Sequence, residues 1–246
     1  MMIFPGGEVH TSLSIPCDVI EKHYIIEATL RNSNDIMDLL LRTNVLSKYD
    51  LHLKMHYVPY ARQDRVCNHG EPLSIKVFAN LINSQGYKSV EILDPHSDVT
   101  PALIDRVRVI PRSRWINRIE GTFSHVICPD AGARKKALKD EAIFKAPLIY
   151  CDKVRNTVTG ELSGFEVYAD KIEGDVIIVD DICDGGGTFC GIAKILKEKG
   201  ANSVSLAVSH GIFSKGLDIF DGLIDAVYTT NSWCNITHSK LKVFKL

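Results

Sequence analysis

This 246-residue sequence lacks long hydrophobic runs, a basic surplus and a recognisable signal peptide. Its apolar stretches, such as residues 176–179, are strand-sized and far shorter than the roughly 20 residues that span a bilayer. Residues 1–5 have neither the charged start nor the apolar core of a signal peptide. Lys and Arg number 29 against 30 Asp and Glu, so the charge does not favour nucleic acid. We therefore expect a cytoplasmic protein that binds neither membranes nor nucleic acids.

Cysteine pairs and the two commonest phosphate-binding motifs are also missing. The seven cysteines are odd in number, scattered and never spaced C-x-x-C, which indicates reduced thiols and argues against structural zinc. No G-x-x-x-x-G-K-[ST] segment occurs, and the glycines at 185–191 do not satisfy G-x-G-x-x-G. Cys183 lies just before three consecutive glycines, and we expect it to be a plain filler of the loop. The alternative is a redox-active thiol whose pKa the helix N-terminus lowers.

Helical and strand-like patterns alternate along the chain. This alternation predicts an α/β fold in which helices cover a parallel sheet on both faces. Helices are expected at residues 35–46 with Asn34 as the N-cap, at 74–84, from 131–134 onward, and at 188–199 before Gly200. Strands are expected at residues 52–58, 90–93, 125–128, 148–151, 176–179, 204–208 and 241–244. The polar segment 156–165 is expected to be a mobile loop.

The segment 176–188 joins an apolar strand, an acidic pair and three glycines directly to a helix. Glycines lack a Cβ, so backbone N–H groups can close on an anion at the positive N-terminus of the helix, where Thr188 adds a hydroxyl. Asp180 and Asp181 suit the vicinal hydroxyls of a ribose, because each carboxylate can accept two hydrogen bonds. The pattern predicts a site for ribose 5-phosphate. The alternative is a tight turn whose aspartates are only solvated.

Four further segments place charged or imidazole side chains at expected strand ends, where open α/β sheets bind ligands. They are YVPYARQDR at 57–65, LDPHSD at 93–98, CPDAG at 128–132 and CDKVR at 151–155. Taken alone, each would be a solvated turn or a structural side chain. Beside a triphosphate, His96 and Asp130 could instead hold Mg²⁺, directly or through water. Lys153 and Arg155 enter the expected mobile loop, and phosphoryl transfer uses cations that arrive as charge builds up.

The order of these segments resembles the ribose-phosphate pyrophosphokinase (phosphoribosyl pyrophosphate synthetase) family. The resemblance runs from FPGGE at 4–8 through PYARQDR, LDPHSD, CPDAG, the K-x-R of 153–155 and VDDICDGGGT to SHGIFS at 209–214. It covers nearly the whole chain in the family's order. It implies two phosphoribosyltransferase-like (type I) domains, each a mainly parallel sheet flanked by helices. Residues 1–113 would carry the ATP-site motifs, and residues 114–246 the ribose 5-phosphate loop.

The resemblance also implies a reaction, in which ribose 5-phosphate attacks the β-phosphorus of Mg-ATP to give phosphoribosyl pyrophosphate and AMP. The ATP contacts would be Phe4, Gly6, Gly7, Glu8, Arg62, Gln63 and Asp64. In the family the hairpin at 4–8 reaches in from a neighbouring subunit, which implies a homo-oligomer. The ribose 5-phosphate contacts would be Arg155, Asp180, Asp181, Asp184, Gly185, Gly186, Gly187 and Thr188. His96 and Asp130 would hold Mg²⁺, and Lys153 and Arg155 would be catalytic.

The sequence departs from the family at both ends. It starts almost on the hairpin, so the family's first strand and helix have no counterpart, and no closing helix follows residues 241–244. We expect a compact form that assembles differently and lacks the control by phosphate and ADP found in some members. Gly6, Pro95 and glycines 185–187 also differ from the commoner family residues.

Two other functions fit parts of the sequence. A phosphoribosyltransferase would use the same glycine loop to consume phosphoribosyl pyrophosphate, but it would give no role to Arg62, Gln63 and residues 4–8. A catalytically inactive companion of a synthetase would be expected to have a disrupted mobile loop, whereas Lys153 and Arg155 are both present.

Overall fold

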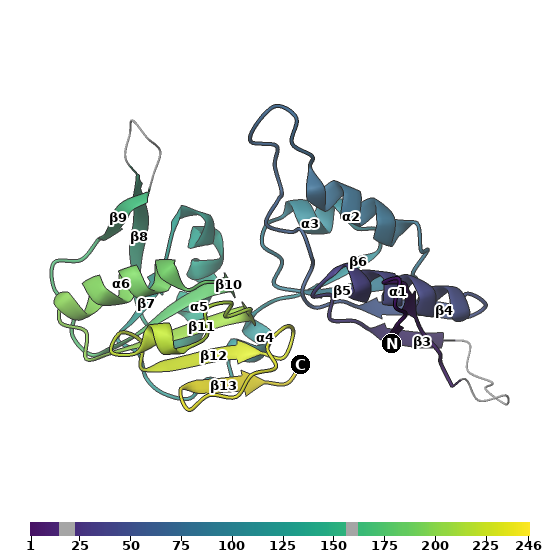
Figure 1. Ribbon diagram of the computed structural model, residues 1–246. Helices are drawn as coiled ribbons and strands as arrows, with labels where there is room; N and C mark the ends of the chain where they lie inside the picture. Colours follow the sequence, from purple (N-terminus) through teal and green to yellow (C-terminus); the bar gives the residue numbers. More distant parts are fainter. Residues whose placement is uncertain (15–22, 156–161) are drawn as a thin grey trace. The chain divides into compact units, whose positions relative to one another are not determined.

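The structure is a computed structural model that describes residues 1–14, 23–155 and 162–246 (Figure 1). The chain divides into two compact units, Met1–Pro111 (unit 1) and Arg112–Leu246 (unit 2). Within the described ranges, no helix has both the length and the apolar character needed to cross a membrane.

The described part of unit 1 forms a parallel sheet, a short hairpin and helices (Figure 1). The sheet has the strand order β3 (His23–Glu27), β4 (Asp50–Lys54), β5 (Ser89–Leu93) and β6 (Val107–Ile110). The helices are α1 (Ser33–Val45), α2 (Ser74–Asn83) and α3 (Val99–Leu103). The hairpin pairs β1 (Met2–Ile3) with β2 (Val9–His10) in antiparallel fashion.

The central strands of unit 1, β4 and β5, alternate between half-buried and buried side chains over most of their length. In β4, Leu51 and Leu53 are buried, whereas Asp50, His52 and Lys54 are half-buried. The two leucines belong to a core that also contains side chains of α1 and α2. Because successive side chains of a strand point to opposite faces, the face with Leu51 and Leu53 packs on this core, and the opposite face of β4 carries polar side chains.

Helix α1 begins at Ser33, earlier than the sequence pattern indicated. The side chain of Asn32 accepts hydrogen bonds from the backbone N–H groups of Asn34 at 2.9 Å and Asp35 at 3.1 Å. The Asp35 carboxylate in turn accepts from the N–H of Asn32 at 3.2 Å. This reciprocal capping box makes Asn32 the N-cap, so the expectation that Asn34 caps the helix is wrong.

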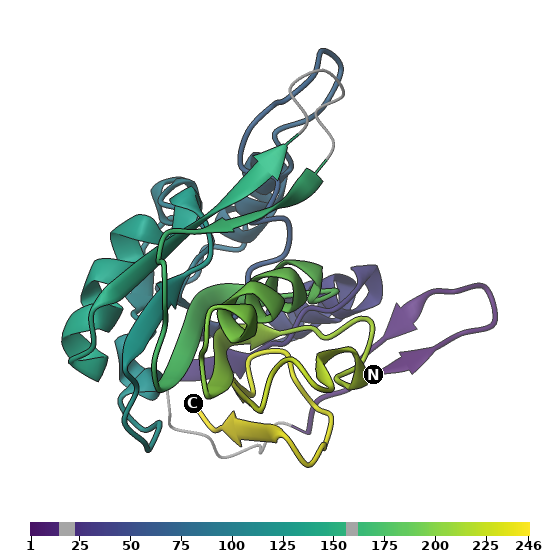
Figure 2. The same cartoon turned by 90° about the vertical axis from the view of Figure 1, so that its left-hand side faces the viewer.

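Unit 2 contains a seven-stranded sheet in the order β13-β12-β11-β10-β7-β8-β9, parallel except for the β8–β9 pair. Its strands are β7 (His125–Cys128), β8 (Leu148–Arg155), β9 (Leu162–Val167), β10 (Asp175–Cys183), β11 (Ser203–Gly211), β12 (Ala226–Thr230) and β13 (Leu241–Phe244). Its helical segments are α4 (Ser113–Ile116), η1 (Ala131–Ala133), α5 (Arg134–Phe144), α6 (Gly187–Glu198) and η2 (Asp218–Phe220). Strands β8 and β9 extend beyond the rest of the sheet as a two-stranded arm (Figure 2).

The central strands of unit 2 are buried on both faces. Residues 176–179 of β10 and 204–208 of β11 are all buried, as expected for strands inside a parallel sheet covered by helices. Helix α6 contributes Phe189, Ile192 and Leu196 to the same core. The carboxyl end of β10, where the acidic pair lies, is therefore supported by tightly packed structure.

Most expected elements are present with shifted ends. The strand expected at 52–58 ends at Lys54. Residues 162–165, expected to be loop, form the start of β9, because their backbone pairs with β8. The remainder of that expected loop, residues 156–161, lies outside the described residues. The predicted α/β architecture with parallel sheets is confirmed.

Candidate active site

The glycine segment expected to bind phosphate connects the end of β10 to the start of α6. Gly186 is the N-cap with a φ of +75°, and a Cβ there would lie 2.6 Å from Cδ1 of Ile219 and 2.9 Å from the ring of Phe220. Glycine is therefore required at this position. A Cβ on Gly187 would meet nothing within 4 Å, so the loop is open there. Among the described residues, no side chain caps α6, which leaves the N–H groups of its first turn available to an anion.

Asp180 and Asp181 lie near the carboxyl end of β10. The Asp180 carboxylate accepts a hydrogen bond from the N–H of Asp181 at 2.8 Å, and the Asp181 residue is buried. Burial raises the pKa of Asp180 well above its usual value, and the charges of Asp181 and Asp130 raise it further. This environment therefore makes it unfavourable for Asp180, Asp181 and Asp130 all to be ionised at once. Hydroxyl donors or a cation supplied by a ligand would offset this penalty.

Asp130, which follows strand β7, is in contact with Lys153, which lies on the neighbouring strand β8. Oδ1 of Asp130 accepts a hydrogen bond from the N–H of Ala133 at 3.1 Å, which fixes the start of η1. Oδ2 accepts from Nζ of Lys153 at 2.8 Å. Both side chains remain partly open to solvent, with exposed fractions of 30% and 32%. A lysine expected to be catalytic and a carboxylate expected to bind metal therefore form an ion pair.

Asp152, the residue before Lys153 on β8, is held by two side chains that the sequence motifs did not indicate. Nη2 of Arg134 donates to both carboxylate oxygens of Asp152, at 3.0 and 2.9 Å, and the Tyr168 hydroxyl donates to Oδ2 at 3.1 Å. The Arg134 guanidinium also lies 5.5 Å from the ring centre of Tyr150. These contacts hold β8 in place next to the position from which the Lys153 side chain projects. The available signal was the basic run directly after CPDAG.

Two further expectations concern residues near this sheet edge. Arg155 ends β8, where its backbone pairs with Leu162, and its side chain lies outside the described part of the structure. The Cys183 side chain is buried in the hydrophobic core, and burial together with the charges of Cys190 and Asp180 raises its pKa. Of the two interpretations of Cys183, the pKa lowered by the helix N-terminus is therefore wrong, because the thiol is withdrawn from solvent; the preferred interpretation was a plain filler of the loop.

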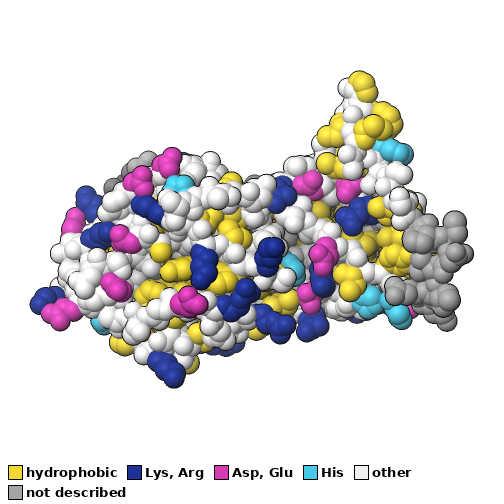
Figure 3. Space-filling view, turned by 90° about the horizontal axis from the view of Figure 1, so that it is seen from below, with side chains coloured by type: hydrophobic (Ala, Val, Ile, Leu, Met, Phe, Trp, Pro, Cys, Tyr) yellow, Lys and Arg dark blue, Asp and Glu magenta, His cyan; other side chains and the backbone are white. Residues whose placement is uncertain are grey.

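The hairpin of unit 1 presents the segment expected to contact ATP. The N–H of Phe4 donates to the carbonyl of Glu8 at 2.9 Å, and the N–H of Gly7 donates to the carbonyl of Phe4 at 2.8 Å. Gly7 has a φ of +92°, and a Cβ on Gly6 would lie 2.7 Å from a Glu8 carboxylate oxygen. Exposed apolar side chains gather at the start of this hairpin (Figure 3): Met1 at 64%, Met2 at 52%, Ile3 at 51% and Phe4 at 44%. A contiguous exposed apolar surface is typical of an interaction site.

The segment 62–65 of unit 1 lies against the segment 93–98 through Asp64. Burial alone would raise the pKa of Asp64, but hydrogen bonds from Arg65 and Ser97 and the charges of Arg65 and His96 lower it overall. Nε of Arg65 donates to Asp64 at 3.0 Å. Asp64 is therefore a buried anion that joins the two motifs, while residues 62–63 are exposed to solvent. The ATP contacts assigned to these residues stay predictions.

Comparison with known proteins identifies the family. The phosphoribosyl transferase domain matches residues 101–220 of this chain. A ribose-phosphate pyrophosphokinase from Mycoplasmopsis pulmonis is 32% identical over 260 residues, which covers 99% of this chain and 80% of that protein. The protein of the same name from Mycoplasma genitalium is 30% identical, covering 91% of this chain and 72% of its own length. The chain belongs to the ribose-phosphate pyrophosphokinase family.

A solved structure of a phosphoribosylpyrophosphate synthetase from Mycobacterium smegmatis has the same fold. The TM-score is 0.86 at 22% sequence identity, and the match covers 99% of this chain and 84% of that one. The family resemblance inferred from the ordered motifs is confirmed. The roles of individual side chains stay predictions.

Magnesium is the ion that membership of this pyrophosphokinase family implies, and the donor set fits a loosely held ion. Among residues 1–14, 23–155 and 162–246, no three His, Cys, Asp or Glu side chains form a group that could hold a metal. Mg²⁺ usually keeps several waters and takes one or two carboxylates plus substrate phosphates, so such a group is not required. Asp130 offers a partly exposed carboxylate of the right chemistry. His96 is exposed in unit 1, but imidazole is a less favourable ligand for this hard ion.

Proposed function

We propose that this protein transfers the pyrophosphoryl group of Mg-ATP to the anomeric hydroxyl of ribose 5-phosphate. The hydroxyl oxygen bonds to the β-phosphorus, the bond from that phosphorus to the α-phosphate oxygen breaks, and the hydroxyl proton is lost. The products are phosphoribosyl pyrophosphate and AMP. One observation carries the proposal: in a chain of this family, the open glycine loop at the start of α6 lies next to the carboxylate pair of β10.

The unit 2 loop supplies the sugar-binding part of this reaction. Uncapped N–H groups at the start of α6 and the Thr188 hydroxyl would bind the phosphate, because the helix dipole favours negative charge at this end. Asp180 and Asp181 would accept hydrogen bonds from the ribose hydroxyls, which would offset the cost of burying two adjacent carboxylates. We also assign Asp184, glycines 185–187 and Arg155 to the binding of ribose 5-phosphate. Binding at both ends would orient the anomeric hydroxyl for attack.

Lys153 is the residue to which we assign stabilisation of the transition state, with Arg155 as its partner on the phosphates or ribose. Its ion pair with Asp130 holds the ammonium at the sheet edge where the carboxylates of β10 also end. Phosphoryl transfer needs little covalent help from the protein, so positioning and charge neutralisation supply most of the catalysis. A lysine aimed at the developing charge would lower the barrier without binding the ground state more tightly.

We assign the ATP contacts to unit 1, through Arg62, Gln63, Asp64 and the hairpin residues 4–8. The exposed apolar start of the hairpin supports a homo-oligomer in which each hairpin serves a neighbouring chain. Mg²⁺ would be held by Asp130 and His96 together with substrate phosphates, and it would neutralise phosphate charge. We place the reaction in the cytoplasm, because both substrates are phosphorylated metabolites.

The direct test follows AMP and phosphoribosyl pyrophosphate together by chromatography after mixing the purified protein with ATP, ribose 5-phosphate and Mg²⁺. Equal amounts of both products, formed only when all three are present, are expected. Lys153→Ala should lower kcat by roughly 10²- to 10⁴-fold and change the KM for ATP far less. The matched control is Lys171→Ala, since Lys171 is 75% exposed and pairs with Glu173. A normal kcat in Lys153→Ala would remove Lys153 from the transition state.

The same assay, together with a substrate-binding measurement and a reaction with added nucleobase and phosphoribosyl pyrophosphate, separates the two rival functions. A protein that binds both substrates without turnover would support the inactive companion. A protein that consumes phosphoribosyl pyrophosphate when a nucleobase is added, and forms no AMP from ATP and ribose 5-phosphate, would be a phosphoribosyltransferase.

A further inference from the structure

The tight turn after β11 is attached to the phosphate loop by several hydrogen bonds. Backbone N–H groups of Ile212 and Phe213 donate to the carbonyl of Cys183, at 2.9 and 3.2 Å. The N–H of Ser214 donates to the carbonyl of Asp184 at 3.2 Å, and the Ser214 hydroxyl donates to the Asp184 carboxylate at 2.6 Å. The turn, residues 213–216, is therefore fixed against the first residues of the loop.

The backbone and packing of this turn show that it is held in one conformation. Phe213 has a φ of +50°, which is unusual for a bulky residue and persists only where packing enforces it. Its ring is buried and lies edge-on to Phe220, at 6.5 Å between ring centres. The N–H of Gly216 donates to the carbonyl of Phe213 at 2.8 Å and closes the turn. The two residues between them are thus presented in a defined direction.

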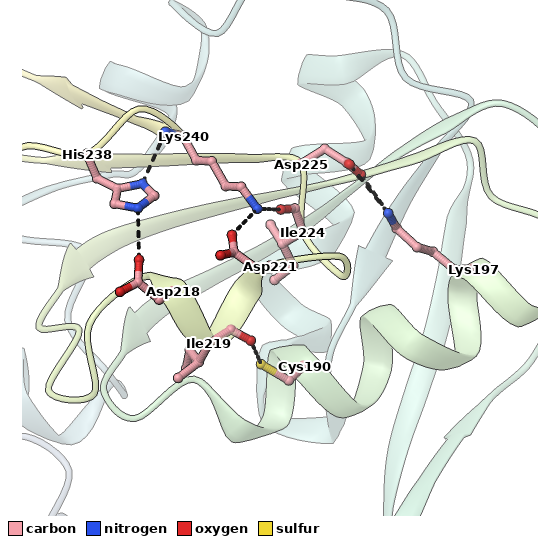
Figure 4. Close-up of polar contacts among 9 residues, drawn as sticks. All are labelled: Cys190, Lys197, Asp218, Ile219, Asp221, Ile224, Asp225, His238 and Lys240. Atoms are coloured by element: carbon pink, nitrogen blue, oxygen red, sulfur yellow. Dashed lines mark hydrogen bonds and ion pairs between the residues drawn. The ribbon is translucent and has the colours of Figure 1, made fainter.

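The segment after the turn is anchored on its far side by ion pairs (Figure 4). His238 lies 3.3 Å from the Asp218 carboxylate, and Nζ of Lys240 lies 2.6 Å from that of Asp221. Hydrogen bonding to Lys240 and its charge lower the pKa of Asp221, so this carboxylate stays ionised at neutral pH. Ile219 packs against Gly186 from the same segment. The turn and the glycine loop therefore form one rigid assembly.

Lys215 is the side chain that this turn places along the glycine loop. Its Cε, Cδ and Cγ lie 3.5, 3.6 and 3.9 Å from the position that a Cβ on Gly185 would take. Its ammonium is one bond beyond Cε, and it makes no hydrogen bond or ion pair with the residues that the structure describes. The other cations of this region differ, since Lys153 pairs with Asp130 and Arg134 with Asp152.

The acidic surroundings of the loop favour such a cation. Three aspartates, at 180, 181 and 184, lie on or next to the loop that would receive a doubly charged phosphate. Backbone N–H groups and a helix dipole provide only partial charges. A lysine serves as a compact point charge for phosphate, and its charge-assisted hydrogen bonds are stronger than neutral ones.

We infer that Lys215 binds the 5-phosphate of the sugar substrate and makes the site selective for a phosphorylated ribose. This inference rests on the proposed function, because it concerns the same sugar site. Ser214 is a positioning residue, since its hydroxyl holds the turn to Asp184. The motif SHGIFS ends one residue before Lys215, so the sequence comparison of motifs gave this lysine no role.

The test is a calorimetric titration of the full chain with ribose 5-phosphate, without ATP, so that binding is measured independently of turnover. Lys215→Met keeps the aliphatic chain against Gly185 and removes the charge; Lys215→Arg keeps the charge. We expect Lys215→Met to weaken ribose 5-phosphate binding by roughly 10- to 100-fold, and Lys215→Arg to recover most of it. The matched control is Lys194→Met on α6, where the lysine is 70% exposed and lies 4.0 Å from Glu198.

A structural role for Lys215 would give a different result. The loss in Lys215→Met should shrink as salt concentration rises, because it reflects an interaction between charges at the surface. Equal affinity of wild type and Lys215→Met would overturn the inference, as would an equal loss in Lys194→Met. Wild-type protein that binds ribose 5-phosphate but forms no AMP would contradict the proposed reaction and leave the lysine result standing. Wild-type protein that does not bind ribose 5-phosphate would overturn both.

Discussion

At the scale of single residues, the candidate site is defined by carboxylates in an unfavourable environment. Asp180 is disfavoured as an anion first by burial and then by Asp181 and Asp130. Asp130 is compensated by the ammonium of Lys153 at 2.8 Å. The free-energy cost of keeping Asp180 ionised remains in the ligand-free protein. Positively charged or hydroxyl-bearing ligands lower this cost, and the difference contributes to their affinity.

The raised pKa of Asp180 predicts how stability depends on pH. Between the usual carboxyl pKa and the raised one, the folded state binds more protons than the unfolded state, so the free energy of unfolding falls as pH rises. Asp180→Asn removes this titration. The variant should melt at a higher temperature than wild type at pH 8, with a smaller difference at pH 4, and should bind ribose 5-phosphate more weakly.

Thermal melts of the ligand-free proteins at both pH values provide the measurement. Asp170→Asn is the control, because Asp170 is exposed on the same unit. An identical difference in melting temperature between wild type and Asp180→Asn at both pH values would show that Asp180 has an ordinary pKa.

At the scale of secondary-structure elements, helix α5 is fixed to unit 2 by a buried ion pair. Arg112 and Asp140 have side-chain exposures of 5% and 1%. Nε of Arg112 donates to Oδ1 of Asp140 at 2.9 Å, and Nη2 donates to Oδ2. Helix α5 follows η1, whose last residue, Ala133, donates its backbone N–H to the Asp130 carboxylate. The pair therefore supports the element that places the Asp130 carboxylate.

Breaking this pair should be costly. Asp140→Ala leaves a buried guanidinium without its carboxylate, and we expect a loss of about 3–5 kcal/mol in the free energy of unfolding of unit 2. Urea unfolding followed by tryptophan fluorescence measures this, since Trp115 and Trp233 both lie in unit 2. The double variant Arg112→Met with Asp140→Leu should recover most of the loss. A loss below about 1 kcal/mol in Asp140→Ala would mean that water replaces the carboxylate.

The sequence indicated the type of most elements but not all of their ends. Strand β7 and the glycine loop with α6 were predictable, because an apolar strand followed by glycines and a helical pattern has local signals. The N-cap at Asn32 was missed because two asparagines stand two positions apart, and the reciprocal hydrogen bonds with Asp35 decide between them. The start of β9 was missed because its polar and glycine content resembles a loop, and only pairing with β8 makes it a strand.

The candidate site was predictable to the extent that its residues lie in contiguous motifs. Contacts between motifs were not, since they depend on tertiary structure: the pairing of Lys153 with Asp130 and the approach of Lys215 to Gly185 join segments far apart in the chain. The burial of Cys183 was also invisible, because a helix N-terminus and a hydrophobic core act on the same residue with opposite effects on its pKa.

At the scale of the whole molecule, we expect neighbouring chains to cooperate in one site. If the hairpin of one chain serves the ATP site of another, Phe4→Asp and Lys153→Ala damage different halves of a shared site. Each variant alone should be nearly inactive, while a mixture refolded together should regain activity, because some sites receive an intact hairpin and an intact lysine. Activity of the mixture that only equals the sum of its parts would place the hairpin in its own chain's site or outside any site.

The most direct test of the central claim is ³¹P NMR of the purified protein with ATP, ribose 5-phosphate and Mg²⁺. We predict that the β- and γ-phosphate signals of ATP disappear together, that AMP accumulates, and that two coupled signals of a sugar-linked pyrophosphate appear in equal amount. Formation of ADP with a singly phosphorylated product, or loss of ATP without any change in ribose 5-phosphate, would contradict pyrophosphoryl transfer.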